Sequence, residues 1–288
     1  MKILVTGANG QLGSEIKERQ EDFPNWNFLF CDVSELDITN LEAVESFVSK
    51  NEISAIVNCA AYTAVDLAET NIECCEAVNV MGAKNLAIVA DKNKIKYIHT
   101  STDFVFDGHH YLPYKEKDCP NPMTVYGRTK LQGEQEVLNK CPKSIVIRTA
   151  WLYSSYGGNF VKTMQRLGRE REQLNVIFDQ VGTPTWAGDL AGVILEIIRE
   201  LEKGGSQKGL YHYSNEGLAS WYDFAVEIME LSNLDCKVLP IETKEYPTPA
   251  PRPAYSVLNK SKIKNDFGLE IPHWKQSLKK CILAIQKL

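Results

Sequence analysis

A tyrosine and a lysine four residues apart, Tyr126 and Lys130, open a predicted helix in the stretch VYGRTKLQGE. Side chains four apart on a helix lie on the same face, so a phenol and an ammonium can converge there on one point. Lowering the pKa of a tyrosine from about 10 to about 7 takes roughly 4 kcal/mol, and a cation about 4 Å away supplies energy of that order. The pair could form an acid-base site, although a core tyrosine beside a solvated lysine would leave the same pattern.

A second pair with this spacing, Tyr111 and Lys115, has Pro113 between its members. Proline removes a helical hydrogen bond, and no amphipathic period follows, so this pair is predicted to lie in a loop. After Tyr126, apolar residues do recur at helical spacing. The sequence therefore favours the pair at Tyr126 as the chemical one.

A glycine-rich turn follows the first predicted strand directly. In TGANGQLG the three glycines are Gly7, Gly10 and Gly13, and the second predicted strand ends at Asp32. Glycines in this context allow a tight turn and the approach of a pyrophosphate to the N-terminus of a helix, and a carboxylate after the second strand can accept from an adenosine ribose hydroxyl. A dinucleotide site is predicted here, with a glycine-rich turn that binds nothing as the alternative.

Polar residues stand just after two further strands. Ala61, Tyr62 and Thr63 follow AIVNCA, and Thr102 and Asp103 end and follow YIHTST. In a parallel sheet these positions face the crevice at the carboxyl ends of the strands. We expect the hydroxyls of the threonine at position 102 and the tyrosine at position 126 to meet over one substrate oxygen, unless the threonine only closes a turn.

Short apolar runs alternate with helical patterns through the first half of the chain, including helices over 11–20, 40–50 and 73–93. This order predicts an α/β fold with a doubly wound parallel sheet of the Rossmann type. We assign 1–150 to a dinucleotide-binding domain, to which 183–203 returns. Residues 151–182 and 204–288 are assigned mainly to a smaller C-terminal substrate-binding lobe, where EYPTPAPRPAY carries four prolines that exclude a helix or a central strand.

Composition narrows the class of protein. The chain has 288 residues, 44% of them hydrophobic, and a net charge of −5, which gives no attraction to nucleic acid or to an anionic membrane. No apolar run is long enough to span a bilayer and no signal peptide is evident, so a cytoplasmic protein is expected. The eight cysteines are spread along the chain and are expected to be reduced thiols, and no metal site is expected because the five histidines lack metal-ligand spacing. The oligomeric state is left open, with a homodimer among the options.

Taken together, the glycine motif that starts at Thr6, the strand-end Thr102 and the Tyr126-x-x-x-Lys130 pair resemble the extended short-chain dehydrogenase/reductases, most of which act on nucleotide sugars. The likeness narrows to the reductases of dTDP-4-dehydro sugars through NCAAYTAVDLAE, STDFVFDG, VYGRTKLQGE, RTAWLY, DQVGTPT and YPTPAPRP. These segments cover the chain from Met1 to about Asn259.

The resemblance implies a role for each matching residue. Tyr126 would donate a proton, Lys130 would hold the nicotinamide ribose and lower the pKa of the tyrosine, and Thr102 would replace a more usual serine. The cofactor would further contact Gly10, Gln11 and Leu12 at the pyrophosphate, Asp32, Asp37 and Ile38 at the adenosine, and Ala61, Tyr62 and Thr63 at the inner ribose. Tyr62 stands where a smaller polar ring is expected.

The sugar nucleotide would contact Asp103 and Trp151. We add Arg252 in the proline-rich segment as a candidate for its diphosphate, because a guanidinium binds phosphate oxygens in a bidentate way. A solvated loop arginine is the alternative.

The implied activity is reduction of dTDP-4-dehydro-L-rhamnose to dTDP-L-rhamnose with NADPH or NADH. Asp32 favours NADH by repelling a 2′-phosphate, although reductases of this kind are similar in tolerating both. One rival is a nucleotide-sugar 4-epimerase or 4,6-dehydratase, but a dehydratase needs a glutamate after Asp103, and Phe104 stands there. The other rival is a non-catalytic regulatory subunit, which the intact Thr102, Tyr126 and Lys130 oppose.

Overall fold

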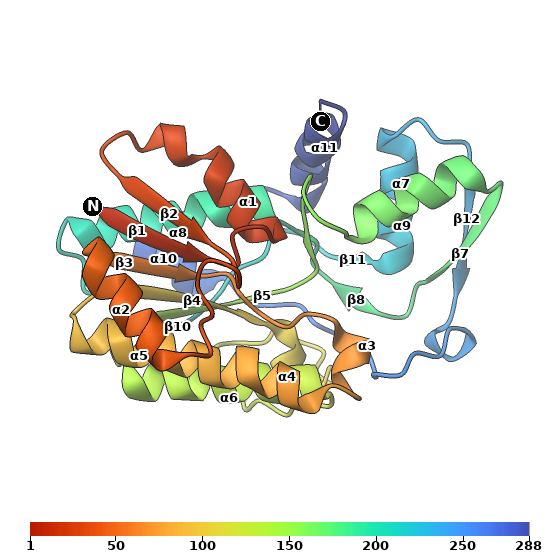
Figure 1. Cartoon of the computed structure of the whole chain (residues 1–288). Helices are drawn as coiled ribbons and strands as arrows, with labels where there is room; N and C mark the ends of the chain where they lie inside the picture. Colours follow the sequence, from red (N-terminus) through yellow and green to blue (C-terminus); the bar gives the residue numbers. More distant parts are fainter. Residues whose placement is uncertain (288) are drawn as a thin grey trace.

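A six-stranded, all-parallel sheet forms the centre of the computed structural model, which describes residues 1–287 (Figure 1). The strand order is β10-β5-β4-β3-β1-β2. The order changes direction between β1 and β3, so a crevice opens there at the carboxyl ends of the strands. The predicted α/β doubly wound fold is confirmed. The strands are β1 (Lys2–Thr6), β2 (Asn27–Cys31), β3 (Ala55–Asn58), β4 (Lys96–Thr102), β5 (Ile145–Thr149) and β10 (Gly209–His212).

Helices cover both faces of the sheet (Figure 1). Strands buried on two sides must be apolar throughout, which explains why runs such as ILV and AIV show no alternation with polar residues. One face carries α2 (Leu41–Asn51), α5 (Ala83–Lys92) and α6 (Val125–Lys140), and the other carries α1 (Gln11–Glu18), α8 (Ala187–Glu202) and α10 (Ser261–Phe267).

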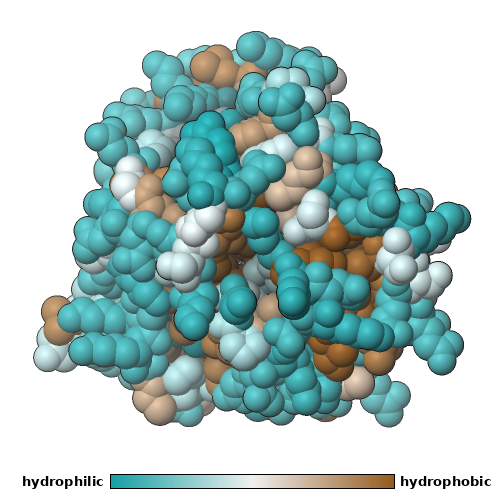
Figure 2. Space-filling model, turned by 90° about the vertical axis from the view of Figure 1, so that its left-hand side faces the viewer, coloured by the Kyte–Doolittle hydropathy of each residue, from teal (hydrophilic) through white to brown (hydrophobic). Residues whose placement is uncertain are grey.

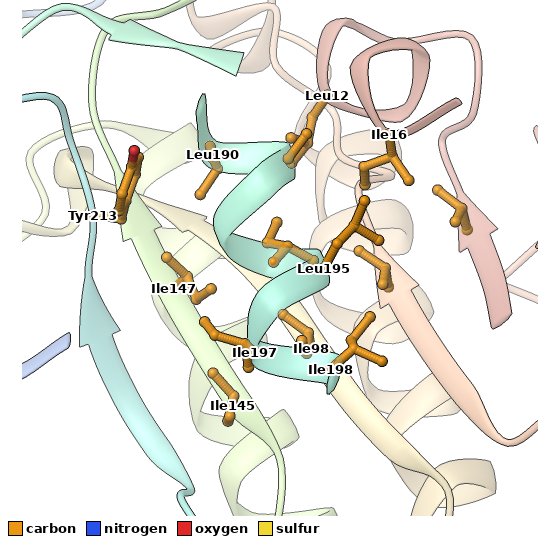
Figure 3. Packing of buried hydrophobic residues seen from close by; sticks show 14 of the residues in the cluster. Leu12, Ile16, Ile98, Ile145, Ile147, Leu190, Leu195, Ile197, Ile198 and Tyr213 are labelled. Carbon is orange, nitrogen blue, oxygen red and sulfur yellow. The ribbon is translucent and has the colours of Figure 1, made fainter. Parts of the chain in front are cut away.

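Helix α8 is the main cover of the second face. Its apolar residues, including Leu190, Leu195 and Ile198, are fully buried against isoleucines of β4 and β5 and against α1 (Figure 3). Each such side chain contributes roughly 1.5–3 kcal/mol by leaving water. This packing joins a helix from late in the chain to the glycine-loop helix α1.

The C-terminal part of the chain contributes more to the sheet than the sequence predicts. Residues 204–288 are assigned above mainly to a substrate lobe, yet β10 pairs with β5 and α10 packs beside it, with Tyr211 and Ile263 in the same core as α8. The run GLYH is only four residues long and is flanked by glycines and polar residues. Its pairing with β5 is a long-range contact that local pattern does not show.

A smaller lobe is built on its own apolar cluster, centred on Phe224, Trp274 and Leu278. Figure 1 places it beyond the carboxyl ends of the sheet strands. Its elements are β6 (Leu152–Tyr153), α7 (Phe160–Glu170), β7 (Gln173–Ile177), β8 (Val181–Gly182), β9 (Thr185–Trp186), β11 (Ala219–Ser220), α9 (Trp221–Leu231), β12 (Lys237–Ile241), η4 (Thr243–Glu245) and α11 (Trp274–Ile285).

The helix predicted over 73–93 is interrupted. It consists of α4 (Ile72–Glu76), a π-helix η2 (Ala77–Gly82) and α5, and it is preceded by the short α3 (Val65–Ala68). The π-helical turn holds the buried Asn79, whose carbonyl oxygen would lie 2.2 Å from a Cβ atom at Gly133 of α6. Only a glycine at this position lets the two helices approach so closely.

The surface is mostly polar on the face seen in Figure 2, where hydrophobic residues show chiefly in hollows between hydrophilic ones. Within residues 1–287, none of the helices combines the length and apolar character needed to cross a membrane. The 3₁₀ helices η1 (Gln20–Asp22) and η3 (Asp103–Val105) complete the described elements.

The contact at Gly133 leads to a stability prediction. Gly133→Ala should lower the free energy of unfolding by about 1–3 kcal/mol, because the added methyl group meets backbone rather than a flexible side chain. Gly192→Ala in α8 is the matched control, since its nearest neighbour, the guanidinium of Arg19, is 3.7 Å away and the helix gains up to about 1 kcal/mol. Urea denaturation of both variants checks this; equal stability of the two would contradict the packing argument.

Candidate active site

A cavity of about 880 Å³ lies at the carboxyl ends of β1, β3 and β4. Its volume is that of a site for a large ligand. Nearly all of the residues that the sequence singled out line it together: Gly7, Gly10, Gln11, Leu12, Asp32, Asp37, Ile38, Ala61, Thr63, Thr102, Asp103, Tyr126, Lys130 and Trp151.

The glycine loop is shaped by close backbone contacts. Gly7 has φ of 65°, and a Cβ atom there would lie 2.6 Å from the backbone nitrogen of Ala60. A Cβ at Gly13 would lie 2.5 Å from the oxygen of Gly7, so this glycine serves helix packing rather than the cavity wall. Gly10 is the N-cap of α1 and provides no side-chain cap. The first N–H groups of α1 are therefore available to an anion.

The far end of the cavity is acidic and well ordered. Asp32 accepts hydrogen bonds from the backbone nitrogens of Asn9 (3.1 Å) and Val33 (2.8 Å), and Asp37 accepts from the nitrogen and hydroxyl of Thr39. A carboxylate has about four lone-pair sites, so each keeps acceptor capacity for a ribose hydroxyl.

Helix α6 carries Tyr126 in its first turn, and Thr124 caps the helix by accepting from the nitrogen of Gly127 at 3.0 Å. A Cβ atom at Gly127 would lie 2.2 Å from the oxygen of Phe104, so glycine is needed for α6 to approach η3. The ring of Phe104 meets the tyrosine edge-on, with centroids 5.5 Å apart. This approach places the tyrosine over Thr102 at the end of β4.

Burial dominates the electrostatics of the tyrosine. It raises the pKa of Tyr126, a hydrogen bond with Thr102 acts in the opposite direction, and the charges of Asp103 and Cys75 raise it further. Lys130 is not among the groups that shift this pKa, and its ammonium donates to the carbonyl oxygen of Thr100 at 2.7 Å, so the expected lowering of the tyrosine pKa by the lysine stays a prediction. The tyrosine is therefore a neutral phenol at neutral pH.

Lys130 is also buried, and burial lowers its pKa to about 8. The negative charge of Glu134, one turn further along α6, opposes that shift, as do Cys75 and Cys59. The lysine is mostly protonated at neutral pH. One of its three donors is used by Thr100, which leaves others for a ligand.

Asp103 and Trp151 stand on the side of the cavity nearest the small lobe. Burial raises the pKa of Asp103 to about 6, although Thr102 donates to its Oδ1 at 3.0 Å. Ser256 also acts to lower this pKa. Trp151 has φ of 49°, which is strained for a tryptophan, and stacks on Trp221 with centroids 3.6 Å apart.

Tyr62 departs from its predicted place, because its side chain is not in the cavity wall. It packs beside a small apolar cluster with Ala68 and Cys75, and its hydroxyl accepts from Asn71 at 3.4 Å. The side chain of Asn79 binds its backbone: Oδ1 accepts from the nitrogen of Tyr62 at 2.9 Å, and Nδ2 donates to the oxygen of Tyr62 at 3.2 Å. The turn therefore presents Ala61 and Thr63, but not the tyrosine ring, to the cavity.

Arg252 is also outside the cavity wall. Its two terminal nitrogens donate to the carboxylate oxygens of Asp66 at 2.9 and 2.8 Å, and one of them also reaches the oxygen of Ala250. The bidentate geometry expected for a diphosphate is thus occupied by an aspartate of α3. The ion pair ties the proline-rich segment to the sheet domain.

Other parts of the wall were missed from sequence. Gly157, Gly158 and Asn159 lie in the loop WLYSSYGGNF, and Ser101 precedes the predicted Thr102. The loop follows the central strand β5, so the rule that placed other loops at the crevice could have found it.

The fold, the glycine loop and the Tyr126–Lys130 pair beside Thr102 define an oxidoreductase of the extended short-chain dehydrogenase/reductase class. The family model of the RmlD substrate binding domain matches residues 1–287, and the chain belongs to this family. A dTDP-4-dehydrorhamnose reductase of Aggregatibacter actinomycetemcomitans is 42% identical over 286 residues, covering 96% of this chain and 97% of the relative. The predicted reductase family is confirmed.

Solved structures agree with this assignment. A dTDP-4-dehydrorhamnose reductase of Clostridium acetobutylicum is similar with a TM-score of 0.94 and 45% identity, covering 99% of this chain and 100% of the other. A reductase of the same name from Bacillus anthracis, in complex with NADP, has a TM-score of 0.93 and 38% identity and covers 98% and 99%.

The raised pKa of Asp103 yields a pH prediction. The folded protein binds the proton of this carboxyl more tightly than the unfolded chain, so stability falls as pH rises from about 4 to about 6. Asp103→Asn cannot ionise and should raise the free energy of unfolding above pH 6 by up to about 3 kcal/mol, with the gain vanishing below about pH 4.

Urea denaturation across this pH range measures the effect. The exposed Asp235→Asn serves as the control and should show no such trend. A gain for Asp103→Asn that is independent of pH would contradict the burial of an ionisable carboxyl as its cause.

Proposed function

We propose that the protein reduces dTDP-4-dehydro-L-rhamnose to dTDP-L-rhamnose with NADPH or NADH, and that Tyr126 donates the proton. The observation that carries this proposal is that Tyr126, Lys130 and Thr102 share one cavity with the glycine loop and Asp32. One cavity can thus hold a dinucleotide and bring a sugar carbonyl to the phenol. Relatives named as dTDP-4-dehydrorhamnose reductases support the choice of sugar.

The residues present fit a nicotinamide dinucleotide. The uncapped N-terminus of α1 and the close-packed glycine loop suit a pyrophosphate, and the buried Oε1 of Gln11 has no partner within residues 1–287. Asp32, Asp37 and Ile38 would hold the adenosine end, and Ala61 and Thr63 the inner ribose. When bound, the dinucleotide supplies the hydride. Asp32 admits NADH most readily, while the NADP complex of a relative supports NADPH as well.

Side chains of α6 and β4 would donate the proton, hold the ribose and bind the sugar oxygen. Tyr126 is protonated at neutral pH, as a proton donor must be. The Thr102 hydroxyl, which donates to Asp103, can rotate and donate instead to the phenolate that is left. Lys130 would hold the ribose through the donors not used by Thr100, and its charge would then balance that phenolate. Thr102 would bind the same sugar oxygen as the tyrosine.

The substrate sugar would lie between the sheet domain and the small lobe, against Asp103 and Trp151. We keep residues 1–150 with 183–203 as the dinucleotide-binding domain, and add β10 and α10 to it. Arg252 would close this region through its pair with Asp66, instead of binding diphosphate directly. A cytoplasmic location and a homodimer stay predictions.

Tyr126→Phe should lower kcat by about a hundredfold or more, because it removes the positioned proton donor but leaves the packing of the ring. Dinucleotide affinity, measured by fluorescence titration, should change little. Tyr111→Phe is the control, since Tyr111 is 84% exposed in a loop. Near-full activity of Tyr126→Phe would assign the proton donor elsewhere.

The reaction class is tested by its stoichiometry. A reductase consumes the dinucleotide, whereas an epimerase or a dehydratase of this fold returns the hydride to the same sugar. With dTDP-4-dehydro-L-rhamnose and NADPH, or NADH in a second series, loss of absorbance should equal the dTDP-L-rhamnose found by chromatography. Turnover without net oxidation would point to an epimerase or dehydratase, and tight dinucleotide binding without turnover would point to a regulatory subunit.

A further inference from the structure

A buried ionic cluster lies directly behind the site. Glu134 of α6 is 2% exposed and has three hydrogen bonds, from the Ser101 hydroxyl to Oε1 (2.5 Å), from Arg148 Nε to Oε1 (2.9 Å) and from Arg148 Nη2 to Oε2 (2.7 Å). Neither Glu134 nor Arg148 lines the cavity. Of the three residues, Ser101 alone lines the cavity, so the ion pair between Glu134 and Arg148 can affect the site only through the residues that it contacts.

The three residues connect the elements that carry the chemistry. Ser101 and Arg148 are paired in register across β4 and β5. Ser101 stands between Thr100, whose oxygen accepts from Lys130, and Thr102. Glu134 follows the lysine by one helical turn on α6. Its carboxylate thus ties the helix of the tyrosine and lysine to the strand end of the threonine.

Stability alone is a poor reason for this cluster. Burying an ion pair costs several kcal/mol per charge, and apolar residues of similar size often hold a core as well or better. Nη1 of Arg148 has no partner within residues 1–287, which adds to the cost. The guanidinium of Arg148 also makes a cation–π contact, with its Cζ atom 5.0 Å from the centroid of the Phe106 ring.

The cluster also places a negative charge next to Lys130. Positions four apart on a helix lie on one face, so the carboxylate favours the ammonium form of the lysine. The other groups whose charges couple to Lys130 are Cys59, Cys75 and His99, and those that couple to Arg148 are Glu116 and His212. At neutral pH Glu134 is the one anion among those that act on the lysine, because burial raises the pKa of both thiols.

We propose that Glu134 is a positioning residue: held by Ser101 and Arg148, it fixes α6 against the ends of β4 and β5 and keeps Lys130 charged and aligned with Thr102. The proposal rests on the proposed reductase function. It adds a residue, outside the cavity, whose effect on the reaction passes through the lysine.

Glu134→Gln keeps the shape and removes the charge. It should lower kcat by about tenfold or more, because small displacements of reacting groups are costly. It should also move the decline of activity at high pH to lower pH by about one unit, since loss of the anion lowers the pKa of Lys130. Glu136→Gln is the matched control on the same helix: its partner Lys84 is 3.2 Å away, the pair is part-exposed, and kcat and pH profile should stay unchanged.

A second variant separates positioning from stability. Glu134→Gln leaves Arg148 as an unpaired buried charge and should lower the free energy of unfolding. The double variant Glu134→Leu with Arg148→Met removes both charges, so its free energy of unfolding should return to about that of the wild type. Its kcat and pH profile should remain those of Glu134→Gln. Recovery of wild-type kcat and pH profile in the double variant would overturn the proposal. Wild-type kcat and pH profile in Glu134→Gln would overturn it as well.

Activity of the wild-type protein tells whether the proposed reductase function, rather than the positioning role of Glu134, has failed. If it oxidises no NADPH with the dTDP sugar, the same variants are compared by NADH affinity across the pH range around 8, the pKa of Lys130. The positioning role is supported if NADH affinity falls at a lower pH than in the wild type in Glu134→Gln and in the double variant, but not in Glu136→Gln. Identical affinity profiles reject it.

Discussion

The parallel alignment of all six central strands is the constraint on which the site depends. Because every strand points the same way, the loops after β1, β3, β4 and β5 end at one edge of the sheet. The change of direction between β1 and β3 opens a crevice there that no side chain of the core fills. The glycine loop, the turn at Ala61 and the strand end at Thr102 meet in this crevice although they are far apart in sequence.

Close backbone packing then sets the position of the chemical groups within the crevice. The contacts of Gly7 with Ala60, Gly127 with Phe104 and Gly133 with Asn79 each leave no room for a Cβ atom. The last two lie on α6, where glycine is otherwise unfavourable by about 1 kcal/mol. The two glycines lower the intrinsic stability of α6, but they let the helix pack closely against η3 and against the π-helix η2. That approach brings Tyr126 to the end of β4.

The sequence predicted the parts of the site that local spacing and strand order define. The glycine motif, Asp32 after the second strand, and Tyr126 with Lys130 on one helix are patterns within a few residues or one unit of the sheet. The rest depends on contacts between distant segments. The pairing of Arg252 with Asp66 spans 186 residues, and the strand β10 is too short to be recognised alone. The direction of Tyr62, away from the cavity and against a small apolar cluster, depends on Asn79 in a π-helical turn that no local pattern indicated.

Burial of Tyr126 and Lys130 decides the electrostatics of the pair, and spacing in the sequence does not show burial. Spacing alone predicts that the charge of Lys130 lowers the pKa of Tyr126, and a coulombic energy of about 4 kcal/mol at about 4 Å holds for a pair near a protein surface. The structure buries both groups, and desolvation becomes the largest influence on each, raising the pKa of the phenol and lowering that of the ammonium. Such a pair suits a proton donor, since the phenol holds its proton until a developing alkoxide takes it. The lysine can then act only if another anion keeps it charged, which is why the carboxylate of Glu134 belongs to the same electrostatic system although it lies behind the cavity.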